Sequence, residues 1–126
     1  MRVKSVHAAL PASDFERAKA WYADKLGLKP AEENMGVATY DVNGTQFGLY
    51  PSQFAGTNQA TAAEFRVDDV ERTVSELRES GVTFEDYDLP ELKTENGIAT
   101  LEDQGTTFKA AWFKDSEANI IAVTGA

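Results

Sequence analysis

The stretch HAALPASDFERAKAWYADKLGL, residues 7–28, reads as a short strand that runs into an amphipathic helix. Its apolar side chains recur at spacings of three and four residues, which places them on one face of a helix. Ser13 precedes this helix as the expected N-cap, and Glu16 stands three residues later in the capping-box position. Gly27 follows as the expected stop, because helices often end on a glycine in the left-handed conformation.

The same design returns 55 residues further along the chain, in EFRVDDVERTVSELRESGV, residues 64–82. The tetrapeptide DFER at residues 14–17 matches DVER at residues 69–72. Asp68 is the expected N-cap of the second helix, and Gly81 is its expected stop. Chance similarity between two amphipathic helices is the alternative, but the matching strands and stop glycines favour a duplication.

Strand-like segments precede and follow both helices. The dipeptide Asn43-Gly44 separates two of these segments, which is a strong hairpin signal. We therefore expect two copies of a strand–helix–strands unit, module one at about residues 1–55 and module two at about 56–126. Long connections are expected at residues 51–60 and 88–97. The strands expected after the helices are 36–42, 45–51, 82–88, 97–103, 106–113 and 119–125.

The composition is that of an ordinary globular chain of one domain. Apolar residues make up 42% of the 126 residues, and 21 acidic against 12 basic residues give a net charge of −9. Such an acidic chain argues against nucleic acid and against an anionic membrane as the main partner. The chain has no cysteine, which excludes disulfides, thiolate metal sites and a cysteine nucleophile. No apolar run reaches membrane-spanning length, so we expect a cytoplasmic protein.

The chain resembles the vicinal oxygen chelate superfamily, which groups glyoxalases, bleomycin-resistance proteins and extradiol, ring-cleaving dioxygenases. The resemblance rests on residues 7–28, the hairpin at Asn43-Gly44, residues 64–82 and AAWFKDSEANIIAV at residues 110–123. It implies an α+β fold of two tandem βαβββ modules, which form a curved mixed-sheet cup with helices on the convex side. Ligands of such proteins bind inside the cup, and many members are homodimers.

One turn departs from the family pattern. Relatives often carry Asp-Pro-Asp-Gly-Asn before the last strand, whereas this chain has Asp-Ser-Glu-Ala-Asn at residues 115–119. The loss of both proline and glycine removes the residues that are best suited to turn dihedral angles. We therefore expect Ala118 or Asn119 to adopt the unfavourable conformation.

Metal-dependent members of the superfamily hold a divalent ion with four inward-facing side chains, two from each module. By resemblance, His7 occupies the first of these positions, while the other three fall on Gly48, Ala62 and Ala122. Glu64 shares a strand face with Ala62, but together with His7 it would supply only two ligands. A divalent metal requires several nitrogen or oxygen ligands, so we expect no metal and no other cofactor.

Strand alternation predicts which side chains face the cup. Either Trp112 or Phe113 faces inward, and we expect Trp112 to form a stacking wall, with core packing as the alternative. Glu64 and Arg66 are two residues apart on one strand, so they can neutralise each other. A lone strand histidine such as His7 is more often a hydrogen-bonded structural residue than a catalyst. The predicted ligand-binding residues are His7, Gln46, Tyr50, Glu64, Arg66 and Trp112.

Three functions agree with these observations. The first is a small-molecule binding protein without a catalytic metal, which sequesters an antibiotic or a metabolite; the acidic charge fits a cationic compound. The second is a glyoxalase-like lyase, isomerase or epimerase, in which His7 and Glu64 do acid–base work with or without a divalent metal. The third is a dimeric protein whose cup is filled by its own side chains. The sequence favours the first, with a small-molecule partner and a homodimer.

Overall fold

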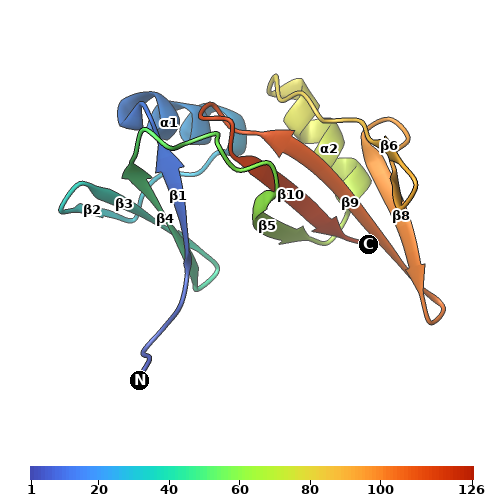
Figure 1. The fold of residues 1–126 in the computed structure, drawn as a ribbon, viewed down its shortest axis with the longest axis horizontal. Coiled ribbons are helices and arrows are strands. Elements are labelled where there is room, and N and C mark those ends of the chain that lie inside the picture. Colours follow the sequence, from blue (N-terminus) through green and yellow to red (C-terminus); the bar gives the residue numbers. More distant parts are fainter.

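The first half of the chain folds into a βαβββ module, as the computed structural model of residues 1–126 shows (Figure 1). Its elements are β1 (Ala8–Ala12), α1 (Phe15–Trp21), the π-helical turn η1 (Tyr22–Leu26), β2 (Glu32–Asn34), β3 (Val37–Val42) and β4 (Thr45–Pro51). The strands form one sheet in the order β1-β4-β3-β2. β1 runs parallel to β4, and the other neighbouring strands are antiparallel.

The second half repeats this topology. Its main elements are β5 (Thr61–Val67), α2 (Val70–Glu79), β8 (Ile98–Asp103), β9 (Thr106–Lys114) and β10 (Ile120–Gly125). They form a second sheet in the order β5-β10-β9-β8, with β5 parallel to β10. A small hairpin of β6 (Asp88–Leu89) and β7 (Leu92–Lys93) is inserted before β8. The matching strand orders confirm the predicted fold of two tandem βαβββ modules.

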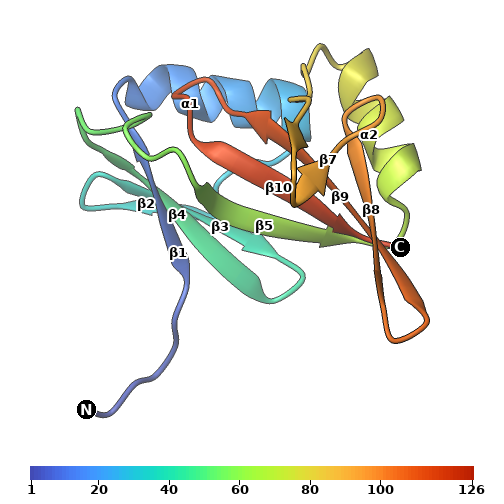
Figure 2. The same cartoon turned by 45° about the vertical axis from the view of Figure 1, so that its right-hand side comes forward.

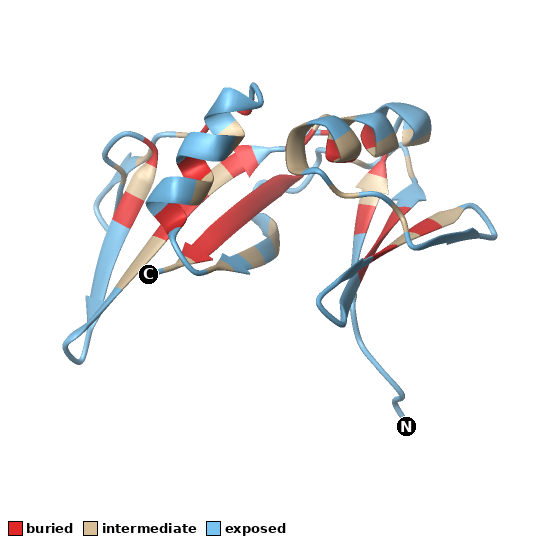
Figure 3. Ribbon diagram, turned by 180° about the vertical axis from the view of Figure 1, so that it is seen from behind, coloured by how far each residue is buried: buried red, intermediate tan, exposed pale blue.

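The two sheets lie side by side, and both helices lie on the same side of them. The sheets spread apart from each other with increasing distance from the helices (Figures 1 and 2). The edge strands β1 and β5 contact each other but form no hydrogen-bonded pair. The residues before β1 extend away from both sheets and are exposed. Buried residues lie where the strands pass beneath the helices (Figure 3). None of the helices has the length and apolar character required to cross a membrane.

The N-cap of each helix lies one residue later than expected. The N-cap of α1 is Asp14, whose carboxylate accepts a hydrogen bond of 3.0 Å from the Arg17 amide. Asp69 caps α2 in the same way. The predicted caps Ser13 and Asp68 are therefore wrong, because the carboxylate of the next residue reaches the amide three positions further on.

Both helices end as predicted, because the stop glycines have left-handed φ angles of 68° at Gly27 and 95° at Gly81. The last turns nevertheless differ between the modules. In module one, the amides of Gly27 and Leu28 both donate to the Tyr22 carbonyl, which widens the turn into a π-helix. Leu26 and Leu28 pack against the core from this turn.

Five of the six expected strands are present, as β3, β4, β8, β9 and β10. The expected strand at residues 82–88 is wrong: Phe84 forms a single bridge to Phe113, and Asp88 is the first residue of a short hairpin. The sequence also gave no sign of β2, β6 or β7. These strands have only two or three residues, too few for an alternating pattern to show.

One hydrophobic core joins the two modules. Leu10 on β1 and Phe113 on β9 are buried beneath the helices, so the residues that alternate with them face the opposite side of each sheet. Aromatic contacts cross the module boundary, with ring centroids 6.0 Å apart for Trp21 and Phe113 and 5.6 Å apart for Phe47 and Phe65. The two sheets therefore share one hydrophobic core.

A polar contact between residues 115–119 and the start of helix α1 also joins the modules; we name it the clasp. The buried Glu117 carboxylate accepts hydrogen bonds from Ser13 Oγ, the Asp14 amide and both Nε and Nη2 of Arg17. Burial alone would raise the pKa of Glu117, but the hydrogen bonds from Arg17, Ser116, Asp14 and Ser13 outweigh it and lower the pKa to about 2. The carboxylate is therefore charged at neutral pH.

The clasp has a second anchor at the end of α1. The Tyr22 hydroxyl donates to Asp115 Oδ2 at 2.7 Å, and Asn119 Nδ2 donates to the Pro11 carbonyl at 2.8 Å. Burial, with the adjacent Asp115 carboxylate, raises the pKa of Tyr22 far above its ordinary value, so the hydroxyl keeps its proton. Ala118 adopts the left-handed conformation, with φ of 66°, as expected for a turn that lacks glycine.

Candidate functional site

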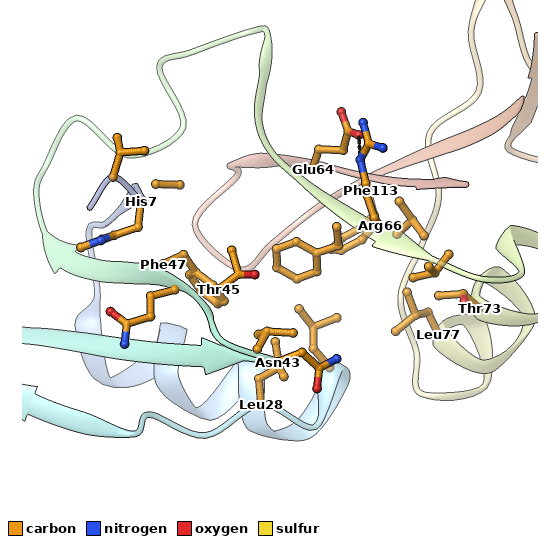
Figure 4. A pocket seen from close by; sticks show the side chains of 18 residues that line it. His7, Leu28, Asn43, Thr45, Phe47, Glu64, Arg66, Thr73, Leu77 and Phe113 are labelled. Atoms are coloured by element: carbon orange, nitrogen blue, oxygen red, sulfur yellow. Dashed lines mark ion pairs between the residues drawn. The ribbon is translucent and has the colours of Figure 1, made fainter. Parts of the chain in front are cut away.

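A cavity of about 690 Å³ lies between the two modules, at the end of β1 that is opposite to the clasp (Figure 4). Both modules contribute to its lining, and 11 of the 18 lining residues are hydrophobic. Its volume falls within the range of about 300–1,000 Å³ that is usual for small-molecule sites. The cavity is therefore the candidate binding site of this chain.

The apolar part of the cavity is made by core residues and their neighbours at the place where the sheets diverge. Phe47, Phe65 and Phe113 reach it from β4, β5 and β9. Leu28 follows the π-helical turn of α1, and Leu77 lies in the last turns of α2. An aromatic or aliphatic ligand in the cavity can therefore contact these apolar side chains where the two modules do not contact each other.

His7 lies at the edge of the cavity, one residue before β1 begins. It is exposed and has no hydrogen-bond partner. The expectation of a hydrogen-bonded strand histidine is therefore wrong. In Figure 4, His7 and Glu64 lie on different sides of the cavity and come from different modules. A free imidazole offers a ligand one donor and one acceptor.

Glu64 and Arg66 line the cavity from β5, where they alternate with Phe65 and Val67. Glu64 Oε1 accepts a hydrogen bond of 2.8 Å from Thr124 Oγ1 and lies 3.3 Å from Arg66 Nε. The predicted mutual neutralisation therefore occurs (Figure 4). The Arg66 side chain is 80% exposed, and an ion pair of this kind adds only about 0–1 kcal/mol to stability.

The structure brings together four of the six predicted ligand-binding residues: His7, Gln46, Glu64 and Arg66 line the cavity. Tyr50 does not line it; this residue lies further along β4, where it pairs with Pro11 of β1. The sequence offered no direct signal for the lining residues that sit on the helix side of the sheets. These additional residues include Leu28, Asn43, Thr73 and Leu77.

Trp112 lies outside the cavity and is engaged by the protein itself. Its neighbour Phe113 is fully buried in the core, so Trp112 lies on the opposite face of β9. The indole Nε1 donates to Thr61 Oγ1 at 3.2 Å, and the ring packs edge-on against Tyr87 at 5.5 Å. Trp112 therefore does not form a stacking wall of this cavity.

The side chains present do not fit a divalent metal. Gly48 pairs with Ala9 and Thr39, and Ala122 lies in register with Glu64, so the family's ligand positions carry no donor groups at these strands. Nowhere in the chain do three or more His, Cys, Asp or Glu side chains gather in a way that could hold a metal ion. Stable metal binding requires several such ligands.

Residues 4–88 match the family model described as Glyoxalase/Bleomycin resistance protein/Dioxygenase superfamily. No curated protein matches the sequence. Among solved structures, UcmS2 is 18% identical with a TM-score of 0.73 over all of both chains. A glyoxalase/bleomycin resistance protein/dioxygenase from Alicyclobacillus acidocaldarius is 18% identical with a TM-score of 0.71, over 99% of this chain and 94% of that one.

A third solved structure with this fold is the genomically encoded fosfomycin resistance protein FosX from Listeria monocytogenes, in complex with Mn(II) and sulfate. It is 11% identical with a TM-score of 0.69, over 100% of this chain and 92% of that one. At such identities the likeness of these structures shows a shared fold and carries no residue roles.

Proposed function

Because the chain belongs to the glyoxalase/bleomycin resistance protein/dioxygenase superfamily, we propose that it binds a small molecule in the cavity between its modules, without a catalytic metal. The observation that carries this proposal is the cavity itself, which is large enough for a drug-sized ligand and mostly apolar. Sequestration of an antibiotic or a metabolite is the proposed role, since binding alone requires no acid, base or metal.

The alternative is a glyoxalase-like lyase, isomerase or epimerase in which His7 and Glu64 do acid–base work. Its support is that both residues line one cavity. A general base must lie within hydrogen-bond reach of the proton that it removes, and Glu64 is engaged by Thr124 and Arg66. We therefore favour binding, and the His7→Ala variant separates the two: unchanged ligand affinity with lost turnover would favour the enzyme.

We also propose that the protein is a homodimer. The edge strands β1 and β5 are each hydrogen-bonded to a neighbour on one side only. Val3 and Val6, next to β1, are 60% and 91% exposed. Open edges with apolar neighbours are usually covered in folded proteins, and light scattering at micromolar concentration tests whether a second copy does so here. The expected cytoplasmic location stays a prediction, which cell fractionation would test.

A small-molecule library screened by thermal shift tests the binding proposal. A ligand at one hundred times its Kd stabilises the native state by about 2.7 kcal/mol. Leu77→Trp fills the cavity from α2, and Thr45→Trp fills it from an exposed strand position that tolerates substitution. The matched control is Leu101→Trp, because Leu101 is exposed on β8 and does not line the cavity.

We expect ligands that raise the Tm of the wild type and of Leu101→Trp, but not that of the two cavity-filling variants. Ligands that stabilise all four proteins equally would place binding elsewhere and contradict the proposed site. A stoichiometric divalent metal in the purified protein, whose removal abolishes an activity, would contradict the metal-free proposal.

A further inference from the structure

The charge of the cavity differs from that of the chain as a whole. The chain carries a net charge of −9, yet Glu64 and Arg66 are the only Asp, Glu, Lys or Arg residues among the lining residues, which also include His7 at the edge. They contribute one charge of each sign. The acidic surplus therefore lies elsewhere on the surface and gives no reason to expect a cation inside the cavity.

Each charge of the cavity has a neighbour of the opposite sign. Glu64 Oε1 accepts from Thr124 Oγ1 at 2.8 Å and lies 3.3 Å from Arg66 Nε. A cationic ligand would compete with Arg66 for Glu64, and an anionic ligand would compete with Glu64 for Arg66. A ligand charge left unpaired against the apolar lining would lose its hydration without compensation.

Apart from His7 at the edge, the remaining polar groups of the cavity are uncharged and can both donate and accept hydrogen bonds. Gln46 and Asn43 carry amide groups, and Thr45 and Thr73 carry hydroxyl groups. The three phenylalanine rings of the lining add aromatic contacts. Such a combination fits an aromatic body with one or two neutral hydrogen-bonding groups.

We propose that the cavity selects uncharged, mainly aromatic molecules that carry one or two hydrogen-bonding groups. The inference rests on the proposed small-molecule function and narrows it to a ligand class. It also replaces the expectation of a cationic compound, which rested on the net charge of the whole chain. The ion pair of Glu64 and Arg66 then acts as a specificity determinant, because it removes both signs of charge from the cavity.

Three probes of one shape test this inference at pH 7: 2-naphthamide, which is neutral, 2-naphthoate, which is an anion, and 2-naphthamidine, which is a cation. Their Kd values are measured by titration calorimetry with the wild type and with two variants. Glu64→Gln leaves Arg66 without its acidic partner, and Arg66→Met leaves Glu64 without its basic partner. Both side chains are partly exposed, so the variants are expected to fold, which circular dichroism checks.

We expect the wild type to bind the amide at least five-fold more tightly than either ion. Glu64→Gln should improve the affinity for the anion relative to that for the amide about five-fold, and Arg66→Met should do the same for the cation. The matched control is Glu71→Gln, which removes an exposed ion pair with Lys109 outside the cavity. It should leave all three affinities unchanged.

Tighter binding of either ion than of the amide by the wild type would overturn the inference and leave the proposed function intact. Unchanged ion affinities in both charge variants would also overturn it, because the ion pair would then not control selection. If none of the three probes binds, the named class is wrong. The proposed function is judged separately, by the library screen with the cavity-filling variants.

Discussion

The two ends of strand β1 meet the second module in opposite ways. At one end, the buried carboxylates of the clasp accept hydrogen bonds from residues at the start and at the end of α1. At the other end, leucine and phenylalanine side chains surround a cavity. Hydrogen bonds of fixed geometry set how the modules are placed, whereas apolar contacts tolerate a gap that a ligand can fill. We infer that stability is concentrated at the clasp and recognition at the cavity.

The largest expected effect comes from removal of the carboxylate at the centre of the clasp. Glu117→Ala leaves the Asp14 amide, the Ser13 hydroxyl and the Arg17 guanidinium without their acceptor. We expect the free energy of unfolding to fall by about 3 kcal/mol, because several hydrogen bonds to one buried, charged acceptor are lost together. Urea denaturation at pH 7 measures this change. Leu28→Ala, at the cavity end, should cost no more than about 1 kcal/mol; equal losses would break the comparison.

The same carboxylate should make stability depend on pH. Its pKa is about 2 in the folded protein and close to its ordinary value of 4.5 in the unfolded chain. A lowered pKa stabilises the folded state above the unfolded value, and this contribution is lost as pH falls through the folded value. Stability should therefore decline between about pH 5 and pH 2, and Glu117→Gln should reduce this decline. An identical decline in the variant would assign it to other groups.

A smaller effect on stability is expected from the removal of a tyrosine hydroxyl group, which can be compared at two buried tyrosines. Tyr22→Phe removes the hydrogen bond to Asp115 and should cost about 2 kcal/mol, since the acceptor is charged. Tyr40 is equally buried, but its hydroxyl has no partner, so Tyr40→Phe should change stability by less than about 0.5 kcal/mol. Thermal unfolding of both variants gives the difference. Similar losses would show that burial, and not the clasp, decides the cost.

The smallest effect should be a gain at the turn of the clasp. Ala118 has a φ of 66°, which is unfavourable for an L-residue and easy for glycine. Ala118→Gly should therefore stabilise the protein by about 0.5 kcal/mol, since relief of strain exceeds the greater flexibility of the unfolded chain. Ligand affinity should stay unchanged, because the turn is remote from the cavity. A destabilised variant would mean that the methyl group contributes packing that outweighs the strain.

Local signals in the sequence were sufficient for most of the fold. Local patterns were visible at the stop glycines Gly27 and Gly81, in the hairpin of residues 36–51 and in the other predicted strands. The duplication was visible as the repetition of such patterns. The clasp could not be predicted, because Arg17 and Glu117 lie 100 positions apart and only the folded chain brings them together. Short strands such as β6 carry too few residues to show a period.

The sequence predicted only part of the lining of the candidate site. Alternation along the strands identified His7, Gln46, Glu64 and Arg66, which do line the cavity. Leu28 and Leu77 could not be predicted as lining residues, because the sequence does not reveal that the modules diverge beneath these residues. Trp112 was placed on the correct face of β9, but the contacts with Thr61 and Tyr87 depend on a connection whose path no local pattern determines.

The span of the clasp along the chain has a consequence for synthesis on the ribosome. Ser13 and Arg17 are made early, yet their acceptor Glu117 is made about 100 residues later. Module one therefore emerges before its docking partner exists, and the two modules lock only after residues 115–119 have been translated. If the clasp also forms late in folding, after the transition state, its loss changes mainly the unfolding rate. Weakening of the clasp should accordingly shorten the lifetime of the native state more than it slows folding.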